Sequence, residues 1–263
     1  MSTSVVTFRS RKGGPVPLTM VTCYDTAFAR VLAASDIDAV LVGDSVAMVV
    51  HGHATTLAAD LDMMVLHTSA VARGIGDKLL VADLPFLAHR RGRREAVDAA
   101  GALLRAGAHA VKLEGAAGNA DVVTHLVESG IPVMGHVGLT PQFVNAFGGF
   151  KVQGRGNEAA DHVLGDAKAL EHAGVFSMVI EGVPAELGGR VTQSVSVPTI
   201  GIGAGAGCDG QILVLHDMLG ITPKVPRFVR RFADGASMVG EAVDGYIAAV
   251  RDRSFPDLPE TYV

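Results

Sequence analysis

The sequence contains no tryptophan, only two cysteines, and aromatic residues at just 5% of its 263 positions. Cys23 and Cys208 lie far apart and match no CxxC or metal-binding spacing, which excludes a disulfide framework and a cysteine-rich zinc site. Long apolar runs are also missing, because none reaches the roughly 18 residues of a membrane span. The first residues carry no recognisable secretion signal. We therefore expect a cytoplasmic protein with no membrane partner.

Positive charge is in short supply, with 22 Lys and Arg against 27 Asp and Glu and a formal net charge of −5. A nucleic-acid partner needs a basic face, so we expect none. Hydrophobic residues make up 49% of the chain, which excludes disorder. The length is sufficient for one large core in a single domain.

Eight short runs of apolar and β-branched residues recur along the chain, each nearly continuous in apolar character. This pattern is typical of parallel strands that are covered on both faces. The predicted strands are Met20–Cys23, Ala39–Val42, Leu79–Ala82, Ala110–Leu113, Pro132–Gly135, Ser177–Ile180, Thr199–Ile202 and Ile212–Leu215.

Most intervals between these strands show the apolar spacing of a helix. The predicted helices include Thr26–Ser35, Arg94–Ala106, Ala120–Ser129, Glu158–Ala173 and Pro184–Val195. Eight alternations of strand and helix in about 250 residues favour an α/β fold of the (β/α)8 TIM barrel type over a doubly wound open sheet, the main alternative. We predict one barrel domain over residues 1–263, with a short N-terminal lead-in and a C-terminal tail.

Polar or charged side chains lie at or directly after the ends of five of the predicted strands. In chain order they are Asp44 with Ser45, Asp83, Lys112 with Glu114, His136, and Glu181. Because the C-terminal strand ends of a barrel meet on one face, we expect these groups to converge on a single pocket. One charge at a strand end is often a cap or an ion pair, but five in succession indicate an active site.

Asp44 and Asp83 follow neighbouring strands and have no His or Cys beside them. Two such carboxylates suit Mg²⁺, which takes few carboxylates and keeps positions open for water or substrate oxygens. The structural alternative is that one Asp caps the following helix while the other pairs with Lys112.

The remaining polar groups suggest acid–base chemistry. Glu181 stands alone after an apolar run, where a carboxylate can act as a general base or take part in a structural ion pair. Lys112 could stabilise negative charge on a substrate oxygen, whereas a Schiff-base role would need a desolvated amine. His136 could donate a hydrogen bond to a carboxylate, act as an acid, or be structural. A metal, a base and an oxyanion stabiliser together indicate enolate formation from a 2-oxo acid.

Two further features each have two interpretations. The segment Gly201–Gly205 either binds a phosphate or another bulky ligand or forms a tight turn, and it does not match the full GxGxxG spacing. The arginines at positions 90, 91, 93 and 94 form either a solvated helix start or a surface that steers an anionic cosubstrate.

At these residues the sequence resembles the ketopantoate hydroxymethyltransferase family, within the superfamily of Mg-dependent barrels that act on phosphoenolpyruvate- and pyruvate-type substrates. The resemblance runs in the same order from about Met20 to Ile221. The matching segments are Val42–Ser45, Ala82–Phe86, Val111–Gly115, Gly135–Gln142, Gly148–Arg155, Ile180–Pro184, Gly201–Gly205, Asp209–Gln211 and Leu215–Asp217.

The resemblance implies a (β/α)8 barrel assembled as a homodecamer of two stacked pentameric rings, a pentamer of dimers. It implies transfer of a hydroxymethyl group from the cosubstrate 5,10-methylenetetrahydrofolate to 3-methyl-2-oxobutanoate, giving 2-dehydropantoate. That reaction is the first step of pantothenate synthesis, on the way to coenzyme A. The expected partners are the 2-oxo acid, the folate and Mg²⁺.

The resemblance also assigns roles to the converging residues. It places Mg²⁺ on Asp44, Asp83 and Glu114. It implies keto-acid contacts from Asp44, Ser45, Asp83, Lys112 and His136. The implied catalytic residues are Lys112, His136 and Glu181, with Glu181 as the proton acceptor. Phe143, Phe147 and the loop through Arg155 are expected near the folate.

Four features depart from the family pattern. Ala47 stands where Gly is usual, and Gly182 stands where Cys is often found. The segment His89–Arg94 is unusually basic, and the tail Phe255–Val263 keeps the Phe-Pro pair but lacks the common Glu-His-Ser. Ala47 and Gly182 flank matched site residues, so we expect them to influence keto-acid preference.

Two other functions fit the pattern less well. A related Mg-dependent, enolate-forming lyase or transferase acting on another 2-oxo acid would share the barrel and the acids. Such enzymes typically carry a reactive cysteine loop, which this sequence lacks. A barrel retained as a binding or assembly protein would be expected to have lost site residues, and none is missing.

Overall fold

The structure is a computed structural model that describes residues 3–262. The chain divides into two compact units, Met1–Val214 and Leu215–Val263, which we describe separately. The single-domain assignment over all 263 residues stays a prediction.

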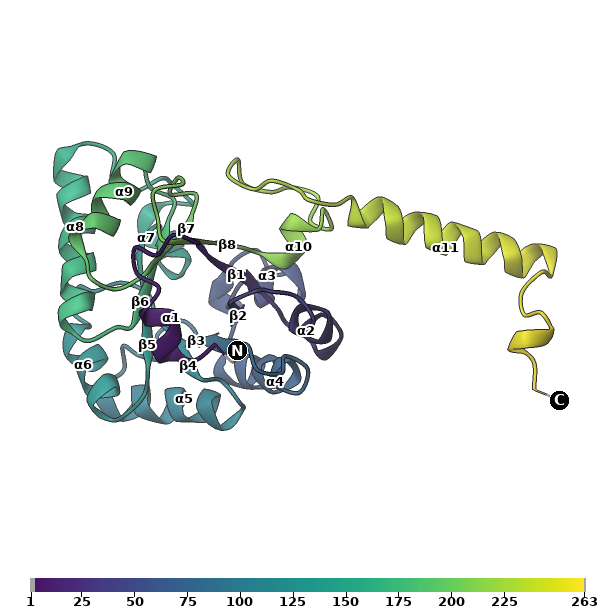
Figure 1. The fold of residues 1–263 in the computed structure, drawn as a ribbon, viewed down its shortest axis with the longest axis horizontal. Coiled ribbons are helices and arrows are strands. Elements are labelled where there is room, and N and C mark those ends of the chain that lie inside the picture. Colours follow the sequence, from purple (N-terminus) through teal and green to yellow (C-terminus); the bar gives the residue numbers. More distant parts are fainter. Residues whose placement is uncertain (1–2, 263) are drawn as a thin grey trace. The chain divides into compact units, whose positions relative to one another are not determined.

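Eight parallel strands in the first unit close into a barrel, which confirms the fold prediction (Figure 1). Each strand pairs with the next along the chain, and the last pairs with the first, with Leu18 opposite Gly210. The strands are β1 (Leu18–Thr22), β2 (Ala39–Val42), β3 (Leu79–Asp83), β4 (Ala110–Lys112), β5 (Val133–Gly138), β6 (Ser177–Glu181), β7 (Thr199–Ile202) and β8 (Gly210–Leu213). All eight predicted strands are present, with ends that differ by up to three residues.

Helices connect the strands, and α4, α5, α6 and α8 lie around the outside of the sheet (Figure 1). The helices of this unit are α1 (Val5–Arg9), α2 (Thr26–Ala33), α3 (Val46–Val49), α4 (Leu61–Ala72), α5 (Arg93–Arg105), α6 (Ala120–Glu128), α7 (Val144–Phe147), α8 (Asn157–His172) and α9 (Ala185–Ser194), with the 3-10 turns η1 (Thr56–Ala58) and η2 (Pro141–Phe143). All five predicted helices are confirmed. The sequence patterns missed α4, because its first turns are almost continuously apolar and show no helical period.

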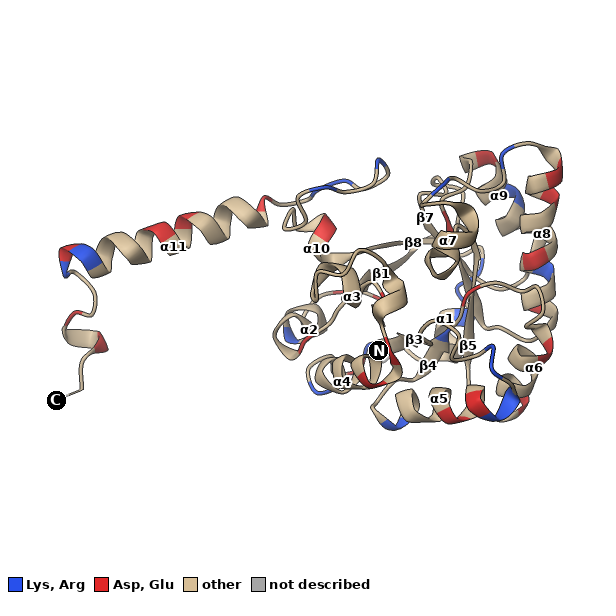
Figure 2. Ribbon diagram, turned by 180° about the vertical axis from the view of Figure 1, so that it is seen from behind, with Lys and Arg blue, Asp and Glu red and all other residues tan. Residues whose placement is uncertain are grey.

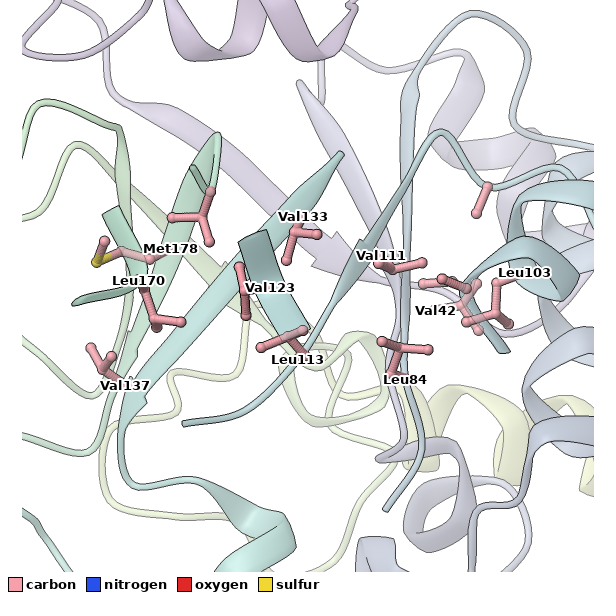
Figure 3. Packing of buried hydrophobic residues seen from close by; sticks show 14 of the residues in the cluster. Val42, Leu84, Leu103, Val111, Leu113, Val123, Val133, Val137, Leu170 and Met178 are labelled. Atoms are coloured by element: carbon pink, nitrogen blue, oxygen red, sulfur yellow. The ribbon is translucent and has the colours of Figure 1, made fainter. Parts of the chain in front are cut away.

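Buried apolar side chains form two layers separated by the sheet. The inner layer fills the barrel with residues such as Leu79, Val81, Met134 and Val179. The outer layer lies between strands and helices, and Figure 3 shows part of it, including Val42, Val111, Val133, Leu170 and Met178. Because successive strand residues point to opposite faces, neighbours such as Val133 and Met134 fall into different layers. Charged residues, by contrast, lie largely on helices and loops such as α5 and α8 (Figure 2).

The same alternation determines what points into the barrel at the strand ends. Two residues after Val81 comes Asp83, and two after Ala110 comes Lys112. His136 follows Met134 by two residues, and Glu181 follows Val179 in the same way. All four polar side chains therefore belong to the inner face, at the C-terminal end of the barrel.

Helix α1 contributes to the inner layer at the opposite end of the barrel. The helix starts with a capping box, in which Ser4 Oγ accepts a hydrogen bond from Thr7 N at 3.1 Å and Ser4 N donates to Thr7 Oγ1 at 2.8 Å. Phe8 is fully buried and meets Phe176 edge to face, with ring centroids 6.1 Å apart. The helix thus closes the barrel with one aromatic side chain.

We predict that Phe8→Ala lowers the free energy of unfolding by about 3–5 kcal/mol, because it leaves a cavity in the inner layer. Val6→Ala on the same helix is the matched control, since Val6 is 76% exposed. Its effect should stay within about 0.5 kcal/mol. Urea denaturation of both variants measures the difference, and equal effects would mean that Phe8 does not close the barrel.

The second unit contains α10 (Leu215–Met218), α11 (Gly235–Asp252) and the 3-10 turn η3 (Leu258–Glu260). Helix α11, which has no predicted counterpart, begins at Asp234, whose side chain accepts a hydrogen bond from Ser237 N. Val239, Val243 and Tyr246 lie along one side of α11 and are 53%, 49% and 59% exposed. Among residues 3–262, no helix is long and apolar enough to cross a bilayer.

Candidate active site

The structure brings the predicted polar residues together at the C-terminal ends of β2 to β6. Asp44, Asp83, Lys112, Glu114 and His136 are all buried, with at most 4% of each residue exposed. Ser45 and Glu181 are partly buried. The predicted convergence of these side chains is confirmed by the contacts between them.

Asp83 links the ends of β2 and β4. Its Oδ2 accepts a hydrogen bond from Asp44 N at 3.0 Å, and its Oδ1 lies 2.9 Å from Lys112 Nζ. Asp83 and Lys112 are opposite each other in the β3–β4 register. The Asp–Lys pair that the structural alternative anticipated is thus present. Asp44, however, caps no helix, because α3 begins after Ser45, whose side chain makes no capping hydrogen bond.

Lys112 is a permanently charged group in this setting. Burial alone would lower its pKa, but the carboxylates of Asp83, Glu114 and Asp44 together raise it above its ordinary value. A charged ammonium is a poor amine nucleophile. The geometry therefore favours a role in stabilising negative charge over a Schiff-base role.

His136 lies between two carboxylates. Its Nδ1 is 3.4 Å from Glu114 Oε1, and its Nε2 is 3.3 Å from Glu181 Oε2. Burial and Lys112 act to lower the pKa of His136, but Glu114 and Glu181 outweigh them and raise it to about 9. Although burial opposes ionisation of Glu114, its contacts with His136 and Lys112 lower its pKa. Glu181 is therefore not the isolated carboxylate expected from the sequence.

The proton on His136 Nδ1 can be assigned from its neighbours. Lys112 Nζ also lies 3.3 Å from Nδ1 and would donate to it if the ring were neutral. Glu114 Oε1, in contrast, is a buried acceptor with no hydrogen bond from the described residues. Lys112 is already paired with Asp83, so we assign Nδ1–H to Glu114 and treat the ring as cationic.

Two buried residues that the sequence analysis did not single out complete the pocket. The Tyr24 hydroxyl lies 2.8 Å from Ser45 Oγ, and burial raises the pKa of this phenol. Gln142 contacts the carboxylates of both Asp44 and Glu114. Tyr24 and Gln142 follow β1 and β5 outside the regular strand positions, so the strand-end pattern did not identify them. The only signal for Gln142 was its place in the matching segment Gly135–Gln142.

The charges of the pocket suit a divalent cation. Burial, followed by repulsion from Asp83 and Glu114, raises the pKa of Asp44 well above its ordinary value. Among the described residues, four carboxylates (Asp44, Asp83, Glu114, Glu181) lie with the cationic side chains of Lys112 and His136, and Arg90 also acts on Glu114. Carboxylates are in excess when all are ionised, and a dication would offset that excess. No group of three or more His, Cys, Asp or Glu within residues 3–262 is arranged to hold a metal. Asp44 and Asp83 are linked by the hydrogen bond from Asp44 N to Asp83 Oδ2, and two such carboxylates leave positions open for water or substrate oxygens, as Mg²⁺ prefers.

Glycines shape the surroundings of Glu181. Gly138, its register partner on β5, has φ +90°, and a side chain there would collide with the Glu181 carbonyl oxygen. Gly182 has φ +57°, and a Cβ there would lie 2.9 Å from Leu139 Cβ. A larger residue at 182 would therefore strain the turn that follows Glu181.

The structure also describes the glycine segment Gly201–Gly205 and the four arginines at positions 90, 91, 93 and 94. Gly203 and Gly205 adopt φ +62° and +80°, as the tight-turn interpretation of this segment requires. Of the four arginines, Arg93 and Arg94 lie at the exposed start of α5, paired with Asp121 and Asp98. Arg90 instead lies 5.0 Å above the Phe143 ring and donates hydrogen bonds to the carbonyl oxygens of Glu114 and Ala117.

A closed (β/α)8 barrel with carboxylates, a lysine and a histidine gathered at its C-terminal end defines the class of α/β-barrel enzymes. The family model described as ketopantoate hydroxymethyltransferase matches residues 2–258. The chain therefore belongs to the ketopantoate hydroxymethyltransferase family.

Curated relatives carry the corresponding enzyme name. The 3-methyl-2-oxobutanoate hydroxymethyltransferase of Bdellovibrio bacteriovorus is 50% identical over 98% of this chain and 99% of its own length. The enzyme of the same name from Legionella pneumophila is 50% identical over 95% of this chain and 96% of its own length. These similarities establish the chain as an enzyme and confirm the family resemblance.

Solved structures with the same fold are more distant in sequence. Phosphonopyruvate hydrolase, in complex with oxalate and Mg²⁺, has a TM-score of 0.63 at 12% identity and covers 99% of this chain and 93% of its own. 2,3-Dimethylmalate lyase, a member of the PEP mutase/isocitrate lyase superfamily, has a TM-score of 0.55 at 19% identity, covering 100% and 91%. At these identities the likeness concerns the fold alone.

We predict that the native protein reacts slowly with Ellman's reagent at pH 8. Burial raises the pKa of Cys23 to about 11 and also raises that of Cys208, so little thiolate is present. For Cys23 the thiolate fraction is roughly 100-fold below that of an ordinary thiol. The same protein in guanidinium chloride is the control and should react quickly at both cysteines. Fast native reaction of either thiol would reopen the lyase alternative with a reactive cysteine.

Proposed function

We propose that the chain transfers a hydroxymethyl group from 5,10-methylenetetrahydrofolate to 3-methyl-2-oxobutanoate, forming 2-dehydropantoate for pantothenate synthesis. The names of relatives 50% identical over nearly the whole chain support the reaction. The observation that carries the mechanism is one cluster of side chains that joins Glu181 and His136 with the Asp83–Lys112 pair. These groups supply a base and a fixed positive charge for a 2-oxo acid.

Mg²⁺ is the proposed metal, and Asp44 and Asp83 are the residues that would hold it. Glu114 is proposed to lie near that ion, with its carboxylate held by Gln142 and His136. When bound, the ion would supply Lewis-acid polarisation of the keto-acid oxygens. Phosphonopyruvate hydrolase, which shares the fold, was solved with Mg²⁺ and oxalate, a dicarboxylate similar in shape to a 2-oxo acid.

The protein's own groups act on the keto acid as follows. Glu181 takes the proton from C3, and the electron pair of the C–H bond moves toward the keto oxygen to form an enolate. Lys112, held as a cation, stabilises the negative charge that develops on that oxygen. His136 keeps the Glu181 carboxylate in place through Nε2, 3.3 Å away. Ser45, held by Tyr24, is proposed to contact the keto acid. The enolate carbon then forms a bond to the one-carbon unit. Both bonds from that carbon to the folate nitrogens break, a water molecule supplies the hydroxyl oxygen, and tetrahydrofolate leaves.

An aromatic surface beside the pocket is a proposed contact for the folate. The Phe143 and Phe147 rings lie 6.1 Å apart, and the Arg90 guanidinium stacks on Phe143. Arg90 also donates to the Glu114 carbonyl oxygen, which connects this surface to the end of β4. Flat aromatic ligands stack readily on such groups.

The homodecamer is likewise proposed. Along α11, Val239, Val243, Tyr246 and Val250 form an exposed apolar stripe at helical spacing, which contact with a further copy of the chain would cover. A cytoplasmic location and the absence of nucleic-acid and membrane partners stay predictions from the sequence.

The second candidate function is enolate-forming cleavage or transfer on a different 2-oxo acid. The fold shared with 2,3-dimethylmalate lyase favours it. The full-length match to the hydroxymethyltransferase family outweighs that likeness.

We predict that Glu181→Gln binds 3-methyl-2-oxobutanoate but loses exchange of its C3 proton by about 10²- to 10⁴-fold, the usual contribution of a general base. Proton NMR in deuterated water with Mg²⁺ measures the exchange. Glu186→Gln is the matched control, because Glu186 is exposed on α9.

The same NMR samples test the reaction as a whole. After 5,10-methylenetetrahydrofolate is added, the wild-type protein should produce hydroxymethyl resonances. Exchange without product would reject the folate as donor and favour the second candidate. Unchanged exchange in Glu181→Gln would remove Glu181 from the role of base.

We predict that Asp83→Asn weakens Mg²⁺ binding by more than about tenfold, because a ligand to the ion is lost and even outer-shell changes cost that much. Asp98→Asn is the control, since Asp98 is an exposed residue of α5 whose Arg94 contact is 3.9 Å long. Calorimetric titration with Mg²⁺ measures both variants. Wild-type affinity in Asp83→Asn would refute the assigned metal site.

A further inference from the structure

We infer that Gln142 is a positioning residue that fixes the Asp44 and Glu114 carboxylates for divalent-cation binding. The inference rests on the proposed function, since it concerns the same metal site. Gln142 belongs to η2, immediately after β5, and is only 4% exposed.

The side-chain amide of Gln142 is held in one orientation. Its Nε2 donates to Asp44 Oδ2 at 2.9 Å and to the Leu84 carbonyl oxygen at 3.0 Å. Both partners are acceptors, so the flipped amide would place its oxygen against two oxygens. The amide therefore points its two N–H groups toward the ends of β2 and β3.

The backbone of the same residue reaches a third strand. Gln142 N donates to Glu114 Oε2 at 2.9 Å, beyond the end of β4. One residue from the β5–α8 connection thus holds groups that follow β2, β3 and β4. Because Glu114 is bound by the backbone N–H, a side-chain substitution at 142 removes only the contacts to Asp44 and Leu84.

These contacts leave Asp44 one oxygen for a ligand. Asp44 Oδ2 is used by Gln142, while its backbone N–H is used by Asp83 Oδ2. Neither of these two hydrogen bonds uses Asp44 Oδ1. A metal-binding carboxylate is commonly held by an outer hydrogen bond to its other oxygen, and loss of such a partner typically costs 10- to 100-fold in metal affinity.

A purely structural role makes a different prediction. If Gln142 only anchored the η2 turn, its substitution would lower stability and leave metal affinity unchanged. If it positions Asp44, the folded variant needs more Mg²⁺ but works normally once Mg²⁺ is saturating. A titration with Mg²⁺ therefore distinguishes the two roles by the measured metal affinity.

The test compares Gln142→Met, which keeps the side-chain length and removes the amide, with the wild type. Calorimetric titration of the full chain with Mg²⁺ should show about 10- to 100-fold weaker binding. The Mg²⁺ concentration that gives half-maximal C3-proton exchange should rise by a similar factor, with the rate at saturating Mg²⁺ close to that of the wild type. Gln193→Met is the matched control, because Gln193 is an exposed residue at the far end of α9.

Gln142→Glu provides a second variant if Gln142→Met does not fold. It keeps the shape, but it adds a negative charge beside the proposed ion, so this variant tests whether position 142 acts on the site through Asp44: its Mg²⁺ affinity should differ from that of the wild type by more than about tenfold, whereas a residue that only anchors the turn would leave the affinity unchanged. Wild-type Mg²⁺ affinity in a folded variant at 142 would overturn the inference, while the proposed function would stand if the wild type still exchanges the C3 proton. If the wild type neither binds Mg²⁺ nor exchanges the proton, the proposed function fails first.

Discussion

The alternation of side chains along a closed parallel barrel is the constraint on which this structure depends. It sends every second strand residue into the lumen, where Leu79, Val81 and Met134 pack as an apolar core. At the C-terminal ends the same positions carry Asp83 and His136 instead. Because the apolar residues of the inner layer fix which face of each strand points inward, the polar residues two positions later also point into the barrel.

The buried charged side chains of the site stabilise one another through ion pairs. Isolated, a buried carboxylate or ammonium would cost several kcal/mol in lost hydration. Here Asp83 pairs with Lys112, and His136 lies between Glu114 and Glu181. The pairs do not cancel, however, because carboxylates outnumber cations. Without a ligand, the repulsion between the excess carboxylates destabilises the folded protein. A bound dication would remove that repulsion and would let the site accept an anionic 2-oxo acid.

Strand order and strand-end chemistry were predictable from the sequence, because both follow from short-range patterns. The position of Asp83, Lys112, His136 and Glu181 at the ends of predicted strands identified them without knowledge of their partners. Partners such as Gln142 were not predictable, since contact between β5–α8 and β2 joins residues 98 positions apart. The position of His136 beside Glu181 depends on the register between the neighbouring strands β5 and β6, so the sequence presented Glu181 as isolated. Helix α4 was missed because an apolar segment shows no period.

The central claim is that the carboxylates after β2 and β3 hold one divalent cation in the lumen, facing Lys112 and Glu181. Anomalous diffraction from crystals grown with Mn²⁺, as a substitute for Mg²⁺, and 3-methyl-2-oxobutanoate tests it most directly. The account predicts one anomalous peak per chain, within about 2.0–2.3 Å of oxygens from both Asp44 and Asp83. A peak at another site, or none at these two residues with the keto acid bound, would contradict it.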